Sequence, residues 1–197
     1  ALVVPDAATV QGLLGDYTYQ AMRAFWKGEQ FDALNPKLVT LKEGLENRLG
    51  SSVSIVHERG CDWSAGLEAK IDKSGFGDSR LGKLKLLTVQ GLPQPNLKNA
   101  IKIAEESDVI IAAVGENISL NGEGRSRKGI GLPGDQEAFV EKLLATGKPV
   151  VLVLFGGRQQ VIDKIEGRCA AIVNAWFPGE EGGNAIADIL IGKVNPS

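Results

Sequence analysis

Short apolar runs rich in β-branched residues recur along the chain, and most are followed by a segment whose apolar positions return every three or four residues. Leu41, Leu45 and Leu49 show the second pattern, which places them on one stripe of a helix that Gly50 then ends. The apolar runs predict strands at residues 2–4, 53–57, 108–114, 150–155 and 170–175. The helical spacing predicts helices at residues 41–49, 97–106, 135–145, 160–166 and 183–191, the second of them capped by Asn96.

Strands that are apolar on both faces and alternate with helices are typical of a parallel sheet covered on both sides. We therefore predict a doubly wound α/β fold, with a mainly parallel sheet of five to six strands and helices on both faces. Residues 15–36 and 64–95 do not fit this pattern, and long connections of this kind are often functional or form interfaces.

The length of 197 residues, 43% of them hydrophobic, is sufficient for one full core, so residues 1–197 are predicted to form one domain. The chain begins like the end of a strand and stops abruptly. We therefore expect a segment of a longer polypeptide, with an insertion at about residues 64–95.

Composition excludes several functional classes. The chain has 22 Lys+Arg against 24 Asp+Glu, a net charge of −2, which argues against a disordered chain and against a strongly basic nucleic-acid binder. Its longest apolar runs are far shorter than the roughly 20 residues that cross a bilayer, so no membrane segment is predicted. Cys61, Cys169 and the single His57 are too few for a zinc site, and we expect neither a metal nor a cofactor.

The densest set of reactive side chains follows the third predicted strand, at residues 115–127. In open parallel sheets, ligands bind beyond the carboxyl ends of the strands, so this loop is well placed for chemistry. Glu123 stands between two glycines, which would let a loop tip carry its carboxyl group into a cleft. Arg125 and Arg127 could tune its ionisation or hold an anionic group. A solvated connection of mixed charge is the alternative interpretation.

Other catalytic motifs are missing. The sequence contains neither of the glycine patterns that cradle phosphates, no GxSxG elbow and no suitably placed histidine for a hydrolase triad. Gly156, Gly157 and Arg158 could form an anion nest, although a tight turn is the simpler explanation of the glycines. Trp176 and Phe177 are interpreted as packing residues rather than as sugar-stacking ones. Carboxylate chemistry remains, and glycosidases use two carboxyl groups, of which this loop offers one.

Ordered motifs along the chain carry a resemblance to a known family. They are VGEN at 114–117, GEGRSR at 122–127, LPGDQ at 132–136, VVLVLFGG at 150–157, AWFPGEEGG at 175–183 and IGKVNPS at 191–197, with LLGDY at 13–17 and RGCD at 59–62. The sequence resembles the C-terminal α/β-sandwich domain of glycoside hydrolase family 3, which includes β-glucosidases, β-xylosidases and related exo-acting enzymes. The resemblance covers nearly the whole chain, except residues 64–95.

This resemblance implies a retaining mechanism, in which an aspartate on an N-terminal TIM barrel is the nucleophile and a glutamate from a loop of this second domain is the acid/base. By its position in the motif, Glu123 is the implied acid/base, and Glu116 is a rival that reads more as a structural residue organising the loop. Low-ranking candidates for substrate contact are Asn121, Arg125, Arg127 and Asp62. A loop aspartate such as Asp62 is, however, more often a turn former.

The implied partners are the N-terminal barrel of the same enzyme and β-linked glucosides or short oligosaccharides, with β-glucosidase as the favoured activity. The isolated segment is expected to be inactive, no nucleic-acid or membrane partner is expected, and a homodimer stays open. Two alternatives are a non-catalytic carbohydrate-binding or interdomain module, and a free-standing flavodoxin-like nucleotide binder. Two distant cysteines do not decide the compartment, for which a secreted or periplasmic setting is preferred to a cytoplasmic one.

Overall fold

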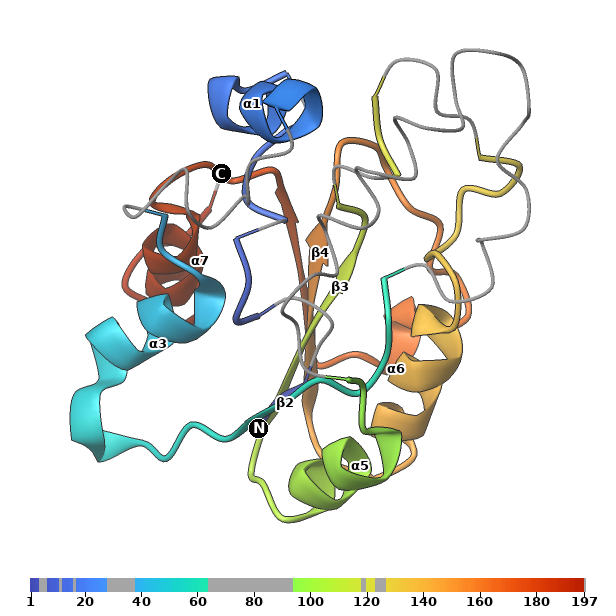
Figure 1. Ribbon diagram of the computed structural model, residues 1–197. Coiled ribbons are helices and arrows are strands. Elements are labelled where there is room, and N and C mark those ends of the chain that lie inside the picture. The colour runs from blue at the N-terminus through green and yellow to red at the C-terminus, as the bar shows by residue number, and fades with distance from the viewer. Residues whose placement is uncertain are drawn as a thin grey trace.

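A five-stranded parallel sheet forms the centre of the molecule (Figure 1). The computed structural model describes residues 1–3, 7–10, 12–15, 17–27, 38–63, 94–117, 120–122 and 127–196, without the side chains of residues 24–27. The strands are β1 (Leu2–Val3), β2 (His57–Glu58), β3 (Ile110–Gly115), β4 (Val150–Phe155) and β5 (Ala171–Trp176). Their order across the sheet is β2-β1-β3-β4-β5. The predicted doubly wound α/β fold is confirmed, with five strands in the described part of the chain.

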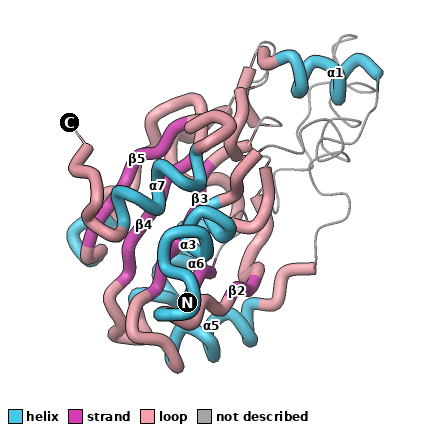
Figure 2. The backbone as a smooth tube through the Cα atoms, turned by 90° about the vertical axis from the view of Figure 1, so that its left-hand side faces the viewer, coloured by secondary structure: helices cyan, strands magenta, loops and turns pink. Residues whose placement is uncertain are grey.

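Helices cover both faces of this sheet (Figures 1 and 2). They are α1 (Tyr19–Lys27), α3 (Leu41–Leu49), α5 (Leu97–Glu105), α6 (Gln136–Leu144) and α7 (Gly182–Leu190), with short 3₁₀ turns at Gly50–Ser52 and Glu166–Arg168. Helices α3 and α7 pack together on one face, and α5 and α6 lie on the other. The α1 helix lies beyond the upper edge of the sheet in Figure 1.

Strands β1, β3 and β4 bury side chains on both faces because each face has its own hydrophobic core, whereas the residues of the edge strand β5 are exposed or half-buried. Ile110, Ala112 and Val114 of β3 belong to the core under α5 and α6. Ala113, between them in sequence, belongs to the core under α3 and α7. This division follows from the two-residue period of a strand, and it explains why the sequence shows unbroken apolar runs.

Local polar contacts set where two of the helices begin. Thr40 and Glu43 form a capping box at the start of α3, in which the Glu43 amide donates to Thr40 Oγ1 at 3.2 Å and the Thr40 amide donates to Glu43 Oε2 at 2.8 Å. Asn96 caps α5 as predicted, because its side-chain oxygen accepts from the Asn99 amide at 3.0 Å.

Two glycines allow α3 and α7 to approach closely. A Cβ atom on Gly44 would lie 2.1 Å from the Gly183 carbonyl oxygen, and a Cβ on Gly183 would lie 2.0 Å from the Thr40 carbonyl oxygen. The backbones of the two helices are therefore in direct contact, and neither position has room for a side chain.

Two expected elements differ from those observed, and one observed helix was not expected. The strand expected at residues 53–57 is observed at His57–Glu58, where it pairs with Leu2 and Val3 of β1. The helix expected at residues 160–166 is wrong, because the Val161 amide donates to the Ile130 carbonyl at 2.8 Å and Val161 forms a parallel bridge with Gly131. Helix α1 lies within residues 15–36, where no element was expected. The insertion expected at residues 64–95 lies almost wholly outside the described residues and stays a prediction.

The strand order also locates the crevice of the sheet. From β1 the chain goes to β2 on one side, and β3 then lies on the other side of β1. Such a reversal opens a crevice at the carboxyl ends of β1 and β3, and open α/β sheets bind ligands at such a crevice. The segment that follows β3 is the reactive loop identified in the sequence.

Candidate functional site

Glycines end both central strands where β3 and β4 lie side by side. Gly115, at the end of β3, has a φ of +131°, and a Cβ atom there would lie 2.0 Å from the Phe155 carbonyl oxygen. Gly156, just after β4, has a φ of +142°. The two glycines let the chain turn sharply where each strand ends. Glu116, the residue after Gly115, is fully buried.

The Gln136 side chain completes the end of β3. In the described part of the chain, β1 pairs with Ile111 and Ala112 of β3, and the pairing stops short of Gly115. The Gln136 Oε1 atom accepts from the Gly115 amide at 2.6 Å, and its Nε2 atom donates to the Gly115 carbonyl at 2.8 Å and to the Trp63 carbonyl at 2.9 Å. The carboxamide thus acts as a substitute for a neighbouring strand, and it fixes the point where the reactive loop begins.

Glu116 is fully buried and its carboxylate is held from three directions. The Oε1 atom pairs with Arg127 Nη1. The Oε2 atom accepts from Asn121 Nδ2 at 2.5 Å and lies 3.0 Å from Arg158 Nε. Burial of a carboxylate is tolerated only when its charge is paired and hydrogen-bonded, and this cluster meets that condition. The contacts support the interpretation of Glu116 as the residue that organises the loop.

Arg158 and Arg127 extend this cluster to the backbone of the loop. Arg158 Nη2 donates to the Leu120 carbonyl at 2.9 Å, and Arg158 Nε donates to Asn121 Oδ1 at 3.1 Å. Arg127 Nη2 donates to the Gly131 carbonyl at 2.8 Å. Arg158 was considered above as part of an anion nest or of a tight turn, and its pairing with Glu116 is visible only when β3 and β4 are placed side by side.

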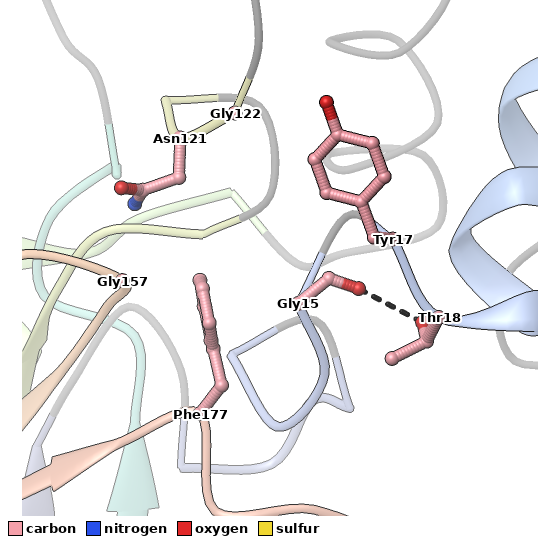
Figure 3. A pocket seen from close by; sticks show the side chains of 7 residues that line it. All are labelled: Gly15, Tyr17, Thr18, Asn121, Gly122, Gly157 and Phe177. Atoms are coloured by element: carbon pink, nitrogen blue, oxygen red, sulfur yellow. Dashed lines mark hydrogen bonds between the residues drawn. The ribbon is translucent and has the colours of Figure 1, made fainter.

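An open pocket of about 550 Å³ lies beside the cluster (Figure 3). Segments that follow three strands line it, together with the segment before α1; the lining residues are Gly15, Tyr17, Thr18, Asn121, Gly122, Gly157 and Phe177. The Phe177 side chain points into the space between Asn121 and Tyr17. A Cβ atom on Gly157 would lie 2.9 Å from Phe177 Cε2 and 3.2 Å from Asn121 Oδ1, so a larger residue at that wall would have to displace these side chains.

The structure brings some of the predicted site residues together and leaves others apart. Asn121 and Arg127 meet at Glu116, and Asn121 also lines the pocket. Asp62 pairs with the buried Arg59 and is not among the residues that line the pocket. Glu123 and Arg125 lie outside the described residues.

Sequence reasoning missed Tyr17, Thr18 and Phe177 as pocket residues. The signal that was available is the gathering of aromatic residues within residues 15–36, a connection already marked as unusual for its length. Phe177 follows β5, whose last residue, Trp176, adopts a φ of +56° that is uncommon for a large side chain. Between Asn174 and Trp176 the pairing with β4 skips Ala175, so a bulge re-aims the chain just before the pocket.

The cysteines of the described chain are free thiols, and Cys61 lies near Asp62. Burial, followed by the charge of Asp62, raises the pKa of the Cys61 thiol to about 12. A thiol with this pKa stays protonated at neutral pH and is a poor nucleophile. Within the residues that the structure describes, no three His, Cys, Asp or Glu side chains gather into a group that could hold a metal ion, and no helix is long and apolar enough to span a membrane.

Comparison with known proteins identifies the family. A profile of the glycosyl hydrolase family 3 C-terminal domain matches residues 1–197, the whole chain. The chain belongs to this family. The resemblance noted in the sequence is therefore confirmed, and the family 3 domain is one whose relatives are β-glucosidases and β-xylosidases.

Two relatives and one solved structure illustrate the similarity. The periplasmic β-glucosidase of Salmonella typhimurium is 36% identical over 159 residues, which are 81% of this chain and 20% of that protein. The β-xylosidase of Formosa agariphila is 31% identical over 166 residues, which are 84% of this chain and 19% of that protein. The structure of a β-glucosidase from Erythrobacter marinus matches 99% of this chain and 24% of its own, with 29% identity and a TM-score of 0.67. The chain spans about a fifth of the length of these two curated relatives.

Proposed function

We propose that the family 3 domain supplies the general acid/base of a retaining, exo-acting β-glycosidase, a β-glucosidase in particular, and that Glu123 is this residue. The observation that carries the proposal is that Gly122 lines the pocket and Glu123 is the next residue in the chain. A carboxyl group on the residue after a pocket-lining glycine needs only a short reach to enter the pocket. The pocket volume of about 550 Å³ falls within the roughly 300–1,000 Å³ typical of small-molecule sites.

The surroundings of Glu116 support Glu123 as the acid/base over this rival. An acid/base must approach the glycosidic oxygen and then a water molecule within hydrogen-bond distance. Glu116 has no exposed surface, and both of its oxygens are engaged by Arg127, Asn121 and Arg158. A substrate would have to displace these groups to reach it, and the displacement would leave buried charges unpaired.

The mechanism needs a second carboxylate from another domain. In a retaining glycosidase, the nucleophile attacks the anomeric carbon while the acid protonates the departing oxygen, and the same residue then takes a proton from the attacking water. We propose that an N-terminal TIM-barrel domain of the same enzyme carries the nucleophilic aspartate. The two carboxyl groups would lie about 5 Å apart, so the active site would form only where the domains meet.

The lining of the pocket suits a sugar. Phe177 and Tyr17 offer aromatic surface to the apolar face of a pyranose ring, and Asn121 offers polar atoms to its hydroxyl groups. The relatives named above act as β-glucosidase and β-xylosidase, so we propose β-linked glucosides or short oligosaccharides as substrates. Because Arg127 is committed to Glu116 and Gly131, we assign it a role in the loop rather than direct contact with the sugar.

The proposed compartment is outside the cytoplasm, either periplasmic or secreted. This proposal rests on the relative from Salmonella typhimurium, which is described as periplasmic.

The test is the change Glu123→Gln in the whole enzyme, with turnover of an aryl β-glucoside as the readout. We expect a loss of about 10²–10⁴-fold, the usual contribution of general acid/base catalysis, with normal folding. Azide should restore turnover to Glu123→Ala, because the small anion takes the place of the activated water. Full activity of Glu123→Gln, or azide rescue of Glu116→Ala instead, would refute the assignment.

The 197-residue chain produced alone should show no hydrolase activity. The two relatives are about four times as long, and the proposed nucleophile lies on another domain. Activity of the isolated chain on aryl glycosides would contradict the division of roles. A parent polypeptide without a barrel carrying an upstream aspartate would favour the alternative of a non-catalytic module.

A further inference from the structure

Two arginines from different elements meet on one buried carboxylate. Arg127 lies at the far end of the reactive loop, and Arg158 lies in the connection between β4 and β5. Both pair with Glu116, which directly follows β3. We call Glu116, Asn121, Arg127 and Arg158 the loop clamp.

The loop clamp holds the loop on both sides of residue 123. Before that residue, Arg158 donates to the Leu120 carbonyl at 2.9 Å and to Asn121 Oδ1 at 3.1 Å. After it, Arg127 bridges Glu116 and the Gly131 carbonyl, the latter at 2.8 Å. Residues 120–121 and residue 127 are thus attached to the same carboxylate, and it is itself fixed to the end of β3.

Stability alone does not account for this arrangement. Removal of three charged groups from water is costly, and apolar residues of similar volume often serve a core equally well or better. The clamp holds two cations and one anion, so it is not a neutral pair. Arg158 also keeps 30% of its side chain exposed, which limits what its ion pair adds to the free energy of unfolding. What the clamp provides is a fixed position for the described residues 120–121 and 127, which have no regular secondary structure.

We propose that Arg158, acting through Glu116 and Asn121, is a positioning residue for the acid/base loop. This inference rests on the function proposed above. Arg158 does not touch the reacting atoms in this scheme. It sets where the loop presents the acid, so its loss should impair proton transfer to the leaving group more than attack by the nucleophile.

The different effects expected on proton transfer and on nucleophilic attack can be told apart by kinetics. A dinitrophenyl glucoside has a leaving group that departs without protonation, so its kcat/KM does not depend on the acid. A phenyl glucoside has a poorer leaving group and does depend on it. A variant that misplaces the acid should therefore lose kcat/KM on the phenyl substrate selectively, whereas a generally damaged enzyme should lose it on both.

The experiment compares Arg158→Gln and Arg158→Lys with Arg48→Gln in the whole enzyme. Arg48 pairs with Asp188 at 2.6 Å in another partly buried ion pair, between α3 and α7, so Arg48→Gln makes the same chemical change away from the loop. Arg158→Lys keeps a cation beside Glu116 but cannot also reach Leu120 and Asn121 with a second donor. It therefore tests positioning even if Arg158→Gln folds poorly.

For Arg158→Gln we expect kcat/KM on the phenyl glucoside to fall by about 10–10²-fold, and on the dinitrophenyl glucoside by less than about threefold. Arg158→Lys should show the same selectivity with a smaller loss, and Arg48→Gln should show none. Equal losses on both substrates, or a selectivity that Arg48→Gln reproduces, would overturn the proposal. The two proposals can fail separately. A fully active Glu123→Gln variant would refute the acid/base assignment. An inactive Glu123→Gln variant, together with an Arg158→Gln variant that keeps wild-type kcat/KM on both substrates, would refute only the positioning role of Arg158.

Discussion

Replacement of Gln136 by methionine should destabilise the domain strongly, although methionine fills nearly the same space. Gln136 is fully buried and is the hydrogen-bond partner of three backbone groups, the Gly115 amide and the Gly115 and Trp63 carbonyls. Each buried polar group left without a partner costs about 1–3 kcal/mol, and the apolar side chain recovers roughly 1–2 kcal/mol of burial. For the three groups together, the expected net loss in the free energy of unfolding is about 1–8 kcal/mol, which can be a large share of the 5–15 kcal/mol typical of a domain.

Urea unfolding followed by tryptophan fluorescence measures this loss, because the buried Trp63 lies beside the substituted side chain. Gln159→Met makes the same change at an exposed glutamine and should alter the free energy by less than about 0.5 kcal/mol. Gln136→Glu should be no better than Gln136→Met at neutral pH, because its second oxygen would face two carbonyl oxygens. It should recover stability toward about pH 4, where the protonated acid can donate to one of them. If Gln136→Met and Gln159→Met unfold at the same urea concentration, the substitute-strand reasoning is wrong.

Two further predictions concern stability. Gly44→Ala should cost about 1–3 kcal/mol because its Cβ would lie 2.1 Å from the Gly183 carbonyl oxygen and force α3 from α7, whereas Gly167→Ala, with open space around it, should stay within about 0.5 kcal/mol in the same urea assay. His57 should make stability fall as the pH drops below about 6.5, since burial, followed by the charge of Lys42, lowers its pKa in the folded state and the unfolded chain then binds more protons. His57→Asn should flatten that part of the pH profile in urea titrations, and an unchanged slope would contradict the assignment to His57.

The sequence was most informative where one strand or helix carries its own pattern. The strand at 150–155 was predicted with its observed bounds, because a strand buried on both faces leaves an unbroken apolar run that ends at glycine. The strand at 53–57 was predicted with the wrong bounds, because its position depends on pairing with β1, a partner distant in sequence. The helix predicted at residues 160–166 was wrong for the same reason, because Val161 pairs with Gly131 and no local sequence pattern predicts this bridge.

The same limit applies to the candidate site. The reactive loop could be found from its glycines and charges, and the ordered motifs indicated the family. The pairing of Glu116 with Arg158 could not be predicted, because these residues are 42 positions apart and meet only through the neighbouring strands β3 and β4. Phe177 packs closely against Gly157, and no spacing of residues along the sequence predicts this packing.

Asn121 belongs both to the loop clamp and to the wall of the pocket. A substitution that reshapes the pocket for another sugar at this position therefore also loosens one attachment of the loop. A change at Asn121 would then alter substrate preference and catalytic rate together. A relative that prefers another sugar because of a substitution at this position would need a compensating change at Arg158 or Arg127. Directed evolution of the domain should accordingly recover paired changes at Asn121 and at the arginines of the loop clamp.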